Sequence, residues 1–206
     1  MDNNFWLQKW RDKEIGFHQK SYHPQLVKFG ERLPTGKVLV PLCGKTLDMI
    51  YLTSLGHQVI GVELSDIACR EFFLENKIAF TEKSIPGFVV FESEQITLYC
   101  GDFFVLPQNV WKEITGIYDR AALVALPADI RKKYAAEIAS KSPKGSEILL
   151  ITFEYGEDTI QGPPFSVSEA ELKNIYAGCN IEWIDSHTES IRGTDVSENA
   201  FRIRIS

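Results

Sequence analysis

The sequence predicts an α/β fold in which helices cover both faces of a mostly parallel sheet. Short apolar runs rich in β-branched residues alternate with helical patterns along the chain of 206 residues. The most apolar run, EILLITFEY at Glu147–Tyr155, has the composition of a strand that is buried on both faces. No repeat or low-complexity segment interrupts the alternation. We therefore expect one doubly wound domain that spans residues 1–206.

The first half of the chain is expected to contribute four strands, at residues 37–41, 59–62, 96–100 and 114–119. A helical pattern follows the first strand, and its apolar face is expected to contain Leu47, Ile50, Tyr51 and Leu55. Ser65 or Asp66 is expected to cap the next helix at its amino end, because both side chains accept hydrogen bonds from backbone amides.

The second half is expected to add a helix at residues 130–140 and the apolar strand at 147–155. Ser168 and Glu171 have the spacing of a capping box, which predicts that another helix begins there. The runs IEWIDS and AFRIRIS are expected to close the chain as two strands. Apolar and basic residues alternate in the second run, which favours a half-exposed position at the edge of a hairpin.

The composition argues against several classes of partner. The formal net charge is −6 and no basic block is present, so nucleic acid and anionic membranes are poor partners. No stretch approaches the ~20 apolar residues of a membrane-spanning helix. Charged residues interrupt the amino end, where a signal peptide would be apolar. We expect a cytoplasmic protein that is a monomer.

The cysteine pattern is consistent with this location. The four cysteines have neither a C-x-x-C pair nor the spacing of a zinc site, and they are Cys43, Cys69, Cys100 and Cys179. Such scattered cysteines are typical of free thiols in a reducing compartment. We expect no metal site.

Large aromatic residues are concentrated at the amino end of the chain. Trp6 and Trp10 lie four residues apart and so share one face of a helix, and Phe17 follows closely. This region is most often frayed in proteins. The segment therefore either packs onto the core or covers a site that benefits from aromatic faces.

The loop PLCGK after the first strand occupies the position of a nucleotide-binding loop. It contains one glycine, Gly44, rather than the three of a pyrophosphate cradle, so a nicotinamide dinucleotide is disfavoured. Glu63 ends the second strand nineteen positions after Gly44, where a carboxylate in such folds binds ribose hydroxyls. A plain tight turn at Gly44 and a solvated acid at Glu63 are the alternatives.

Two further loops follow strands that end at the same edge. In GDFF, Asp102 is placed to accept a hydrogen bond from an exocyclic amine and Phe103 to stack on a purine, or both belong to a simple turn. In DRAALVALP, Asp119 and Arg120 lie between apolar runs, which indicates either an internal ion pair or an arginine that faces an anionic group. The stiff loop GPPF at Gly162–Phe165 is a candidate wall of a substrate pocket.

These motifs together resemble the thiopurine S-methyltransferase family, most closely its bacterial branch. The resemblance rests on VLVPLCGKTLDMIYLTSLGHQVIGVELS, GDFF, YDRAALVALPADIRKKYA, GPPFSVS and the FW-x-x-x-W start. It implies a class I methyltransferase that uses S-adenosylmethionine and has a Rossmann-like sheet of seven strands, the last of them antiparallel. It implies an amino-terminal helical flap at residues 1–33. The implied cofactor contacts are Trp6, Trp10, Phe17, Leu42, Gly44, Glu63, Asp102, Phe103 and Arg120.

The resemblance implies methyl transfer to the sulfur of small aromatic or heterocyclic thiols, or, as an alternative, a detoxifying methylation of inorganic selenium or tellurium species. Such thiols are largely ionised near neutral pH and need no general base. Arg120 is expected to orient an anionic substrate or the cofactor carboxylate, and Asp119 to hold Arg120. A non-catalytic protein that binds S-adenosylmethionine is a further alternative. Of the four histidines, His18 is singled out, because it lies beside Phe17 in the expected flap.

Overall fold

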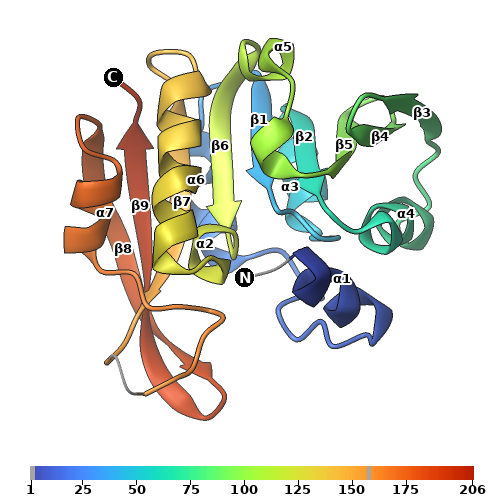
Figure 1. Ribbon diagram of the computed structural model, residues 1–206. Helices are drawn as coiled ribbons and strands as arrows, with labels where there is room; N and C mark the ends of the chain where they lie inside the picture. Colours follow the sequence, from blue (N-terminus) through green and yellow to red (C-terminus); the bar gives the residue numbers. More distant parts are fainter. Residues whose placement is uncertain (1–2, 157–158) are drawn as a thin grey trace.

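The computed structural model describes residues 3–156 and 159–206, and one twisted sheet of nine strands forms its centre (Figure 1). The strand order across the sheet is β3-β4-β5-β2-β1-β6-β7-β9-β8. The strands are β1 (Lys37–Pro41), β2 (Gln58–Glu63), β3 (Thr81–Ile85), β4 (Phe88–Glu92), β5 (Ile96–Gly101), β6 (Ile114–Arg120), β7 (Glu147–Glu154), β8 (Asn180–Ile191) and β9 (Thr194–Arg204).

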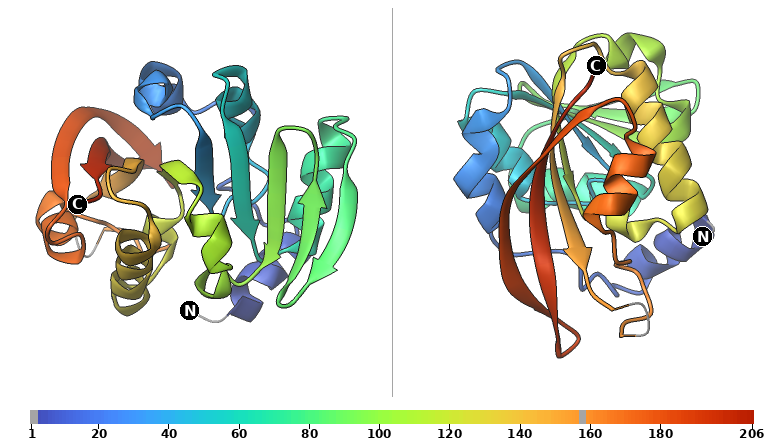
Figure 2. Two further views of the ribbon diagram at one scale, coloured as in Figure 1. Left: turned by 90° about the horizontal axis from the view of Figure 1, so that it is seen from above. Right: turned by 90° about the vertical axis from the view of Figure 1, so that its left-hand side faces the viewer.

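Helices cover both faces of the sheet, which confirms the predicted α/β arrangement (Figure 2). Apolar side chains of α2, α3 and α4 pack on one face, and those of α5, α6 and α7 pack on the other. The helices are α1 (Asn3–Arg11), α2 (Pro24–Phe29), α3 (Asp48–Ser54), α4 (Asp66–Glu75), α5 (Gln108–Trp111), α6 (Ala128–Lys141) and α7 (Glu169–Ile175). Short 3₁₀ turns lie at Gly30–Arg32, Phe103–Val105 and Leu123–Ala125.

The expected count of seven strands is wrong, because residues 81–92 form a hairpin that extends the sheet beyond β5. β4 pairs antiparallel with both β3 and β5. Gly101 permits this pairing, since a Cβ atom there would lie 2.4 Å from the carbonyl oxygen of Gly87. β3 is mostly exposed and therefore lacks the apolar signature of a buried strand. The other seven strands follow the order β5-β2-β1-β6-β7-β9-β8, with β9 antiparallel to β7 as expected.

The closing hairpin is longer than expected. The predicted strand IEWIDS covers only the first part of β8, and AFRIRIS covers the last part of β9 and the two residues after it. Both strands extend to a turn at Arg192 and Gly193. β8 is the edge strand, whereas β9 lies between β7 and β8, so the last strand is interior. In Figure 1 the far end of this hairpin projects past the carboxyl ends of β1 and β6, on the same side as α1.

The predicted helix starts agree with the structure, but one predicted face does not. The Ser65 and Ser168 side chains accept hydrogen bonds from the amides of Ala68 and Glu171, as caps do. In α3 the apolar side chains that are buried are Met49 and Leu52. The expected face with Leu47, Ile50, Tyr51 and Leu55 is only partly covered.

The amino-terminal segment divides into two parts. α1 and the loop after it lie at the carboxyl ends of the parallel strands (Figure 1). α2 instead belongs to the core, because Leu26 and Phe29 are buried in the cluster on one face of the sheet. The segment expected as a flap, residues 1–33, thus includes core residues of α2, whereas among its described residues those that line the cleft lie between Asn3 and Gln19.

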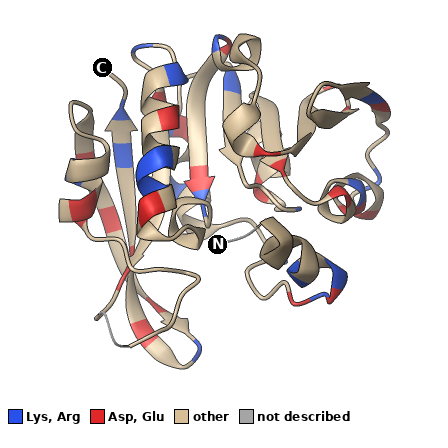
Figure 3. Cartoon of the chain, viewed as in Figure 1, with Lys and Arg blue, Asp and Glu red and all other residues tan. Residues whose placement is uncertain are grey.

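Acidic and basic residues are interspersed along the elements, as α6 shows, rather than grouped by sign (Figure 3). No helix in the described part of the chain is long and apolar enough to cross a membrane.

Candidate active site

A cleft of about 880 Å³ lies at the carboxyl ends of the parallel strands. This is the edge at which α/β sheets bind their ligands. The loops after β1, β2, β5 and β6 form one part of its wall, and the tip of the β8–β9 hairpin forms another. All nine residues expected to contact the cofactor line this cleft: Trp6, Trp10, Phe17, Leu42, Gly44, Glu63, Asp102, Phe103 and Arg120.

Glu63 is fixed at the end of β2 by two backbone amides. The Gly44 amide donates to Oε2 and the Ser65 amide donates to Oε1, both at 2.8 Å. Burial raises the pKa of the Glu63 carboxyl, and these amides counteract part of the increase. A carboxylate has about four lone-pair sites, so each oxygen retains one for a ligand hydroxyl.

The loop after β1 is held against β2 in a strained conformation. The Cys43 amide donates to the Val62 carbonyl at 3.0 Å. This hydrogen bond lies next to the one between the Gly44 amide and the Glu63 carboxylate. Leu42 has φ of 47° and Gly44 has φ of 52°, values that are unfavourable for residues with a Cβ atom. A Cβ atom at Gly44 would also lie 3.0 Å from Cζ2 of Trp10. The single glycine of PLCGK is therefore required by both its backbone and its neighbour.

The aromatic residues of the amino-terminal segment form one cluster above this loop. The Phe17 ring lies 5.7 Å from the rings of both Trp6 and Trp10, in edge-to-face contact. Trp10 is buried. Arg120 ties the segment to the end of β6, since its Nη1 donates to the Phe17 carbonyl at 3.0 Å. His18 also lines the cleft, and burial, followed by the nearby Lys45, lowers its pKa.

The GDFF loop combines one available acceptor with rings that mostly pack inward. Asp102 Oδ1 accepts a hydrogen bond from the Phe104 amide at 2.9 Å, which is the turn anticipated as the simpler alternative. Phe103 is buried against Trp111 and Tyr134. Phe104 is the more exposed ring at the cleft and was not identified from the sequence.

Asp119 does not pair with Arg120, contrary to expectation. Its carboxylate is fully buried outside the cleft lining, where it accepts hydrogen bonds from the Tyr134 hydroxyl at 2.7 Å and the Leu123 amide at 3.1 Å. Burial raises the pKa of Asp119 to about 6. Asp119 thus anchors the turn after β6 to α6, and Arg120 faces the cleft without it.

Several residues of the cleft were missed by sequence analysis. Asp48 accepts hydrogen bonds from the His23 amide at 2.8 Å and from the Tyr118 hydroxyl at 2.9 Å, and it forms part of the cleft floor. The cleft lining also includes Glu198 and the hairpin tip at residues 189–192. These positions are separated by up to 150 residues, counted from 48 to 198, and no local motif connects them.

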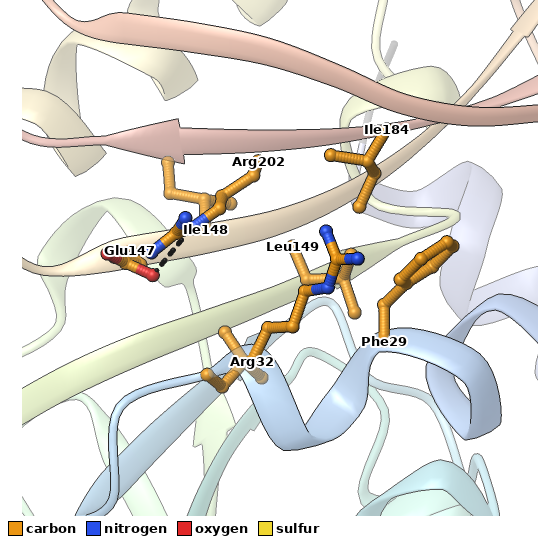
Figure 4. A pocket seen from close by; sticks show the side chains of 8 residues that line it. Phe29, Arg32, Glu147, Ile148, Leu149, Ile184 and Arg202 are labelled. Atoms are coloured by element: carbon orange, nitrogen blue, oxygen red, sulfur yellow. Dashed lines mark hydrogen bonds and ion pairs between the residues drawn. The ribbon is translucent and has the colours of Figure 1, made fainter.

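A second hollow, beneath α2, is not a ligand site. It measures about 10 Å³, roughly the space of one water molecule. Its wall includes Phe29, Leu149 and Ile184, and the Glu147 carboxylate binds the Arg202 guanidinium beside them (Figure 4). The large cleft is therefore where a small-molecule ligand fits.

The family comparison agrees with this geometry. A family model described as thiopurine S-methyltransferase matches residues 1–204. A thiopurine S-methyltransferase from Shewanella sp. (strain W3-18-1) is 43% identical over 190 residues, which cover 91% of this chain and 82% of that protein. One from Shewanella baltica (strain OS155) is 45% identical over 171 residues, covering 82% and 78%.

The chain belongs to the thiopurine S-methyltransferase family. It is a methyltransferase, and S-adenosylmethionine is its methyl donor. Solved structures show the same fold at low identity. The Burkholderia thailandensis 1,6-didemethyltoxoflavin-N1-methyltransferase has a TM-score of 0.67 at 16% identity, covering 99% of this chain and 87% of that one. The magnesium protoporphyrin IX methyltransferase of Synechocystis PCC 6803 has a TM-score of 0.66 at 14% identity, covering 100% and 98%.

The residues of the cleft fit this methyl donor. S-adenosylmethionine carries vicinal ribose hydroxyls but no phosphate, and Glu63 offers two anchored acceptor oxygens next to a loop without a phosphate cradle. The cleft volume of about 880 Å³ lies within the range of small-molecule sites, about 300–1,000 Å³.

Proposed function

We propose that this methyltransferase acts on the sulfur of small aromatic or heterocyclic thiols. The observation that carries the proposal is that one cleft contains both the anchored Glu63 and a separate apolar wall. That wall includes Leu126, Pro127, Phe153 and Pro163, which suit the faces of a flat ring. The curated relatives are named for thiopurine S-methylation, which agrees with such an acceptor.

In this proposal Glu63 accepts hydrogen bonds from the two ribose hydroxyls through its remaining lone pairs. Asp102 uses its second oxygen to accept from the exocyclic amine of the adenine. Trp6, Trp10 and Phe17 lie at the sulfonium end, where aromatic faces attract a cation and exclude water. When bound, the donor supplies an activated methyl group, and the protein mainly positions the two reactants.

Arg120 is the residue that orients the anionic group of the acceptor or of the donor. One of its N–H groups binds the Phe17 carbonyl, and four of the five donors of a guanidinium remain. It makes no ion pair among the residues that the structure describes, so its charge is available at the cleft. Asp119 acts on the reaction only by holding the turn after β6 in place.

Binding of S-adenosylhomocysteine to the wild type and to Glu63→Ala, measured by calorimetry, tests the site. Loss of hydrogen bonds from a charged acceptor is expected to weaken binding by about 1.5–3 kcal/mol, roughly ten- to a hundredfold. Glu113→Ala is a matched control, because Glu113 is exposed beside the start of β6, at the opposite edge of the sheet. Equal binding by wild type and Glu63→Ala would contradict the assignment, and no binding by the wild type would favour a non-catalytic protein.

The acceptor is tested separately by mass detection of methylated products. The wild type is incubated with S-adenosylmethionine and either aromatic thiols or inorganic selenium and tellurium oxyanions. Methylated thiols support the proposal. Turnover of the oxyanions alone would replace it with the metalloid reaction.

A further inference from the structure

One histidine and two glutamates meet on the inner side of the β8–β9 hairpin. His187 and Glu189 lie two residues apart on β8, so their side chains emerge on the same face. Glu198 on β9 is the direct cross-strand partner of His187. The register of the hairpin therefore brings three metal-binding side chains together, and we name them the hairpin triad.

The distances between side-chain atoms in the hairpin triad match those between two ligand atoms of one metal ion better than they match hydrogen bonds. His187 Nε2 lies 3.4 Å from Glu198 Oε1 and 3.8 Å from Glu189 Oε2. One ligand atom from each residue lies within 4.8 Å of the others. Charge-assisted hydrogen bonds are shorter, about 2.7–2.9 Å. Two ligands of a tetrahedral zinc ion, each about 2.1 Å from the metal, lie about 3.4 Å apart.

One oxygen of the buried Glu198 carboxylate lacks a hydrogen-bond partner among the described residues. Glu198 is 2% exposed, and this oxygen is Oε1. Its Oε2 lies 3.3 Å from Nε2 of the buried His23. A buried carboxylate is unfavourable unless a cation and well-aligned donors compensate it. The unpartnered oxygen faces His187, where a bound cation would supply the missing charge.

Gln25 contacts Nδ1 of His187, the ring nitrogen that is not directed at the two glutamates. Its amide nitrogen lies 3.0 Å from Nδ1 of His187, whereas its Oε1 has no hydrogen-bond partner among the described residues. Amide orientation is assigned by the hydrogen-bond network. As placed, the amide nitrogen donates to Nδ1, so a metal ion at Nε2 requires the amide to turn until Oε1 accepts from Nδ1–H. This turn also gives up the hydrogen bond from Gln25 to Asp185. Metal-binding histidines usually donate their other N–H to such an oxygen.

We propose that His187, Glu189 and Glu198 bind a divalent transition metal ion of the zinc type. Imidazole is a ligand of zinc and its neighbours in the periodic table, whereas calcium and magnesium prefer oxygen ligands alone. Three protein ligands leave a fourth position open. The sequence predicted no metal site because that expectation rested on cysteine spacing, and a cross-strand set leaves no local spacing.

The metal site borders the cleft. Glu189 and Glu198 both line it, so an ion held by the hairpin triad lies at the wall of the cleft. A thiolate is a soft ligand that suits zinc. The open position thus offers a binding point for a thiol acceptor. This role of the metal rests on the proposed S-methylation, whereas the metal site itself is independent of that proposal.

Calorimetric titration of the chelator-treated full chain with Zn²⁺ tests the site. We expect one ion per chain for the wild type and no displacement by excess Mg²⁺. Glu189→Gln, Glu198→Gln and His187→Ala are each expected to weaken Zn²⁺ binding at least about tenfold. Glu182→Gln is the matched control, because Glu182 is an exposed glutamate on the same strand outside the triad, and it should bind Zn²⁺ as the wild type does.

Binding of S-adenosylhomocysteine is measured on every variant as a control of folding. Glu189 is exposed, so Glu189→Gln is informative even where substitution of the buried Glu198 prevents folding. No saturable Zn²⁺ binding by the wild type, or equal binding by the wild type and Glu189→Gln, would overturn the metal site. Intact cofactor binding together with that result would leave the proposed methyl transfer standing.

Discussion

The loops after β1, β2 and β6 and the tip of the β8–β9 hairpin border the same cleft, but different interactions hold them in place. The loops are fixed by buried carboxylates: Glu63 binds the Gly44 and Ser65 amides, and Asp119 binds the Leu123 amide. The hairpin is held by strand pairing and, at its tip, by Arg192, whose guanidinium donates to the carbonyls of Gln161 and Pro163 at 2.9 Å each.

The two regions also differ in how deeply their residues are buried. β6 is buried along most of its length, whereas most residues of β8 are partly or fully exposed. A substitution in the first region therefore disturbs the core of the protein, whereas one at an exposed position of β8 mainly changes the surface. Under the proposed function, β8 is where the acceptor side of the cleft can vary at little cost in stability, whereas β9 is mostly buried.

The largest contrast is expected from two aromatic truncations. Phe103→Ala removes a ring that is 2% exposed and packed against Trp111 and Tyr134, and we expect a loss of about 3–5 kcal/mol in the free energy of unfolding. Trp183→Ala on β8 removes a ring that is 54% exposed, and we expect a loss below about 1 kcal/mol. Urea denaturation of both variants measures the difference.

Phe103→Leu separates packing from ligand contact. Leucine keeps most of the buried volume but offers no flat face for a purine. Unchanged affinity for S-adenosylhomocysteine in this variant would show that Phe103 is a core residue, and a marked loss would support stacking on the adenine. Similar losses of stability in Phe103→Ala and Trp183→Ala would contradict the distinction between the two regions.

The next effect is a pH dependence that arises at Asp119, which anchors the turn after β6. Burial raises the pKa of Asp119 to about 6 from an ordinary value of 3.8. Above the raised pKa the folded protein contains a buried charge, and below the ordinary value both the folded and the unfolded chains are protonated. Asp119 therefore lowers stability as pH rises between these values, by about 3 kcal/mol in total.

Urea denaturation of the wild type and Asp119→Asn near pH 4 and pH 7 isolates this contribution. We expect the wild type to lose stability relative to Asp119→Asn as pH rises, because asparagine does not titrate. Parallel pH profiles for the two proteins would show that the Tyr134 hydroxyl and the Leu123 amide fully compensate the buried charge.

The two regions also differ in how far the sequence predicts them. Gly44 and Glu63 were identified because each lies at the end of a strand, within a local motif whose position in an α/β sheet is general. Glu198 was missed because it reaches the cleft through strand register. Asp48 lies only four residues after Gly44. Its partners, however, the His23 amide and the Tyr118 hydroxyl, come from distant segments. Local patterns carry no information about such long-range pairing.

Two expectations, the ion pair between Asp119 and Arg120 and the count of seven strands, are wrong because local sequence does not show where each residue is placed in the sheet. Asp119 and Arg120 are adjacent in sequence, which favours an ion pair, but neighbouring side chains on a strand point to opposite faces. Asp119 accordingly meets Tyr134 of α6, and Arg120 faces the cleft. The strand count was too low because β3 is mostly exposed, so its residues lack the apolar pattern that marks a buried strand.

The smallest expected effect comes from Arg192→Ala at the hairpin tip. It removes two exposed hydrogen bonds to the 161–163 loop, so the free energy of unfolding should change by less than about 0.5 kcal/mol. Under the proposed function, the loosened wall should raise the KM for a thiol acceptor about three- to tenfold, as loss of roughly 0.5–1.5 kcal/mol implies. Steady-state kinetics measures the KM for the acceptor, and calorimetry with S-adenosylhomocysteine measures the affinity for the cofactor.

Arg192→Lys and Arg204→Ala sharpen this test. Lysine keeps the charge but lacks the planar fork that reaches two carbonyls, so it should resemble Arg192→Ala. Arg204 is exposed at the other end of β9, and its truncation should leave both the KM and cofactor affinity unchanged. A loss of cofactor affinity in Arg192→Ala as large as its effect on KM would mean that the hairpin and the loops act as one unit, because a wall that contacts the acceptor alone has no means of weakening a ligand held by Glu63.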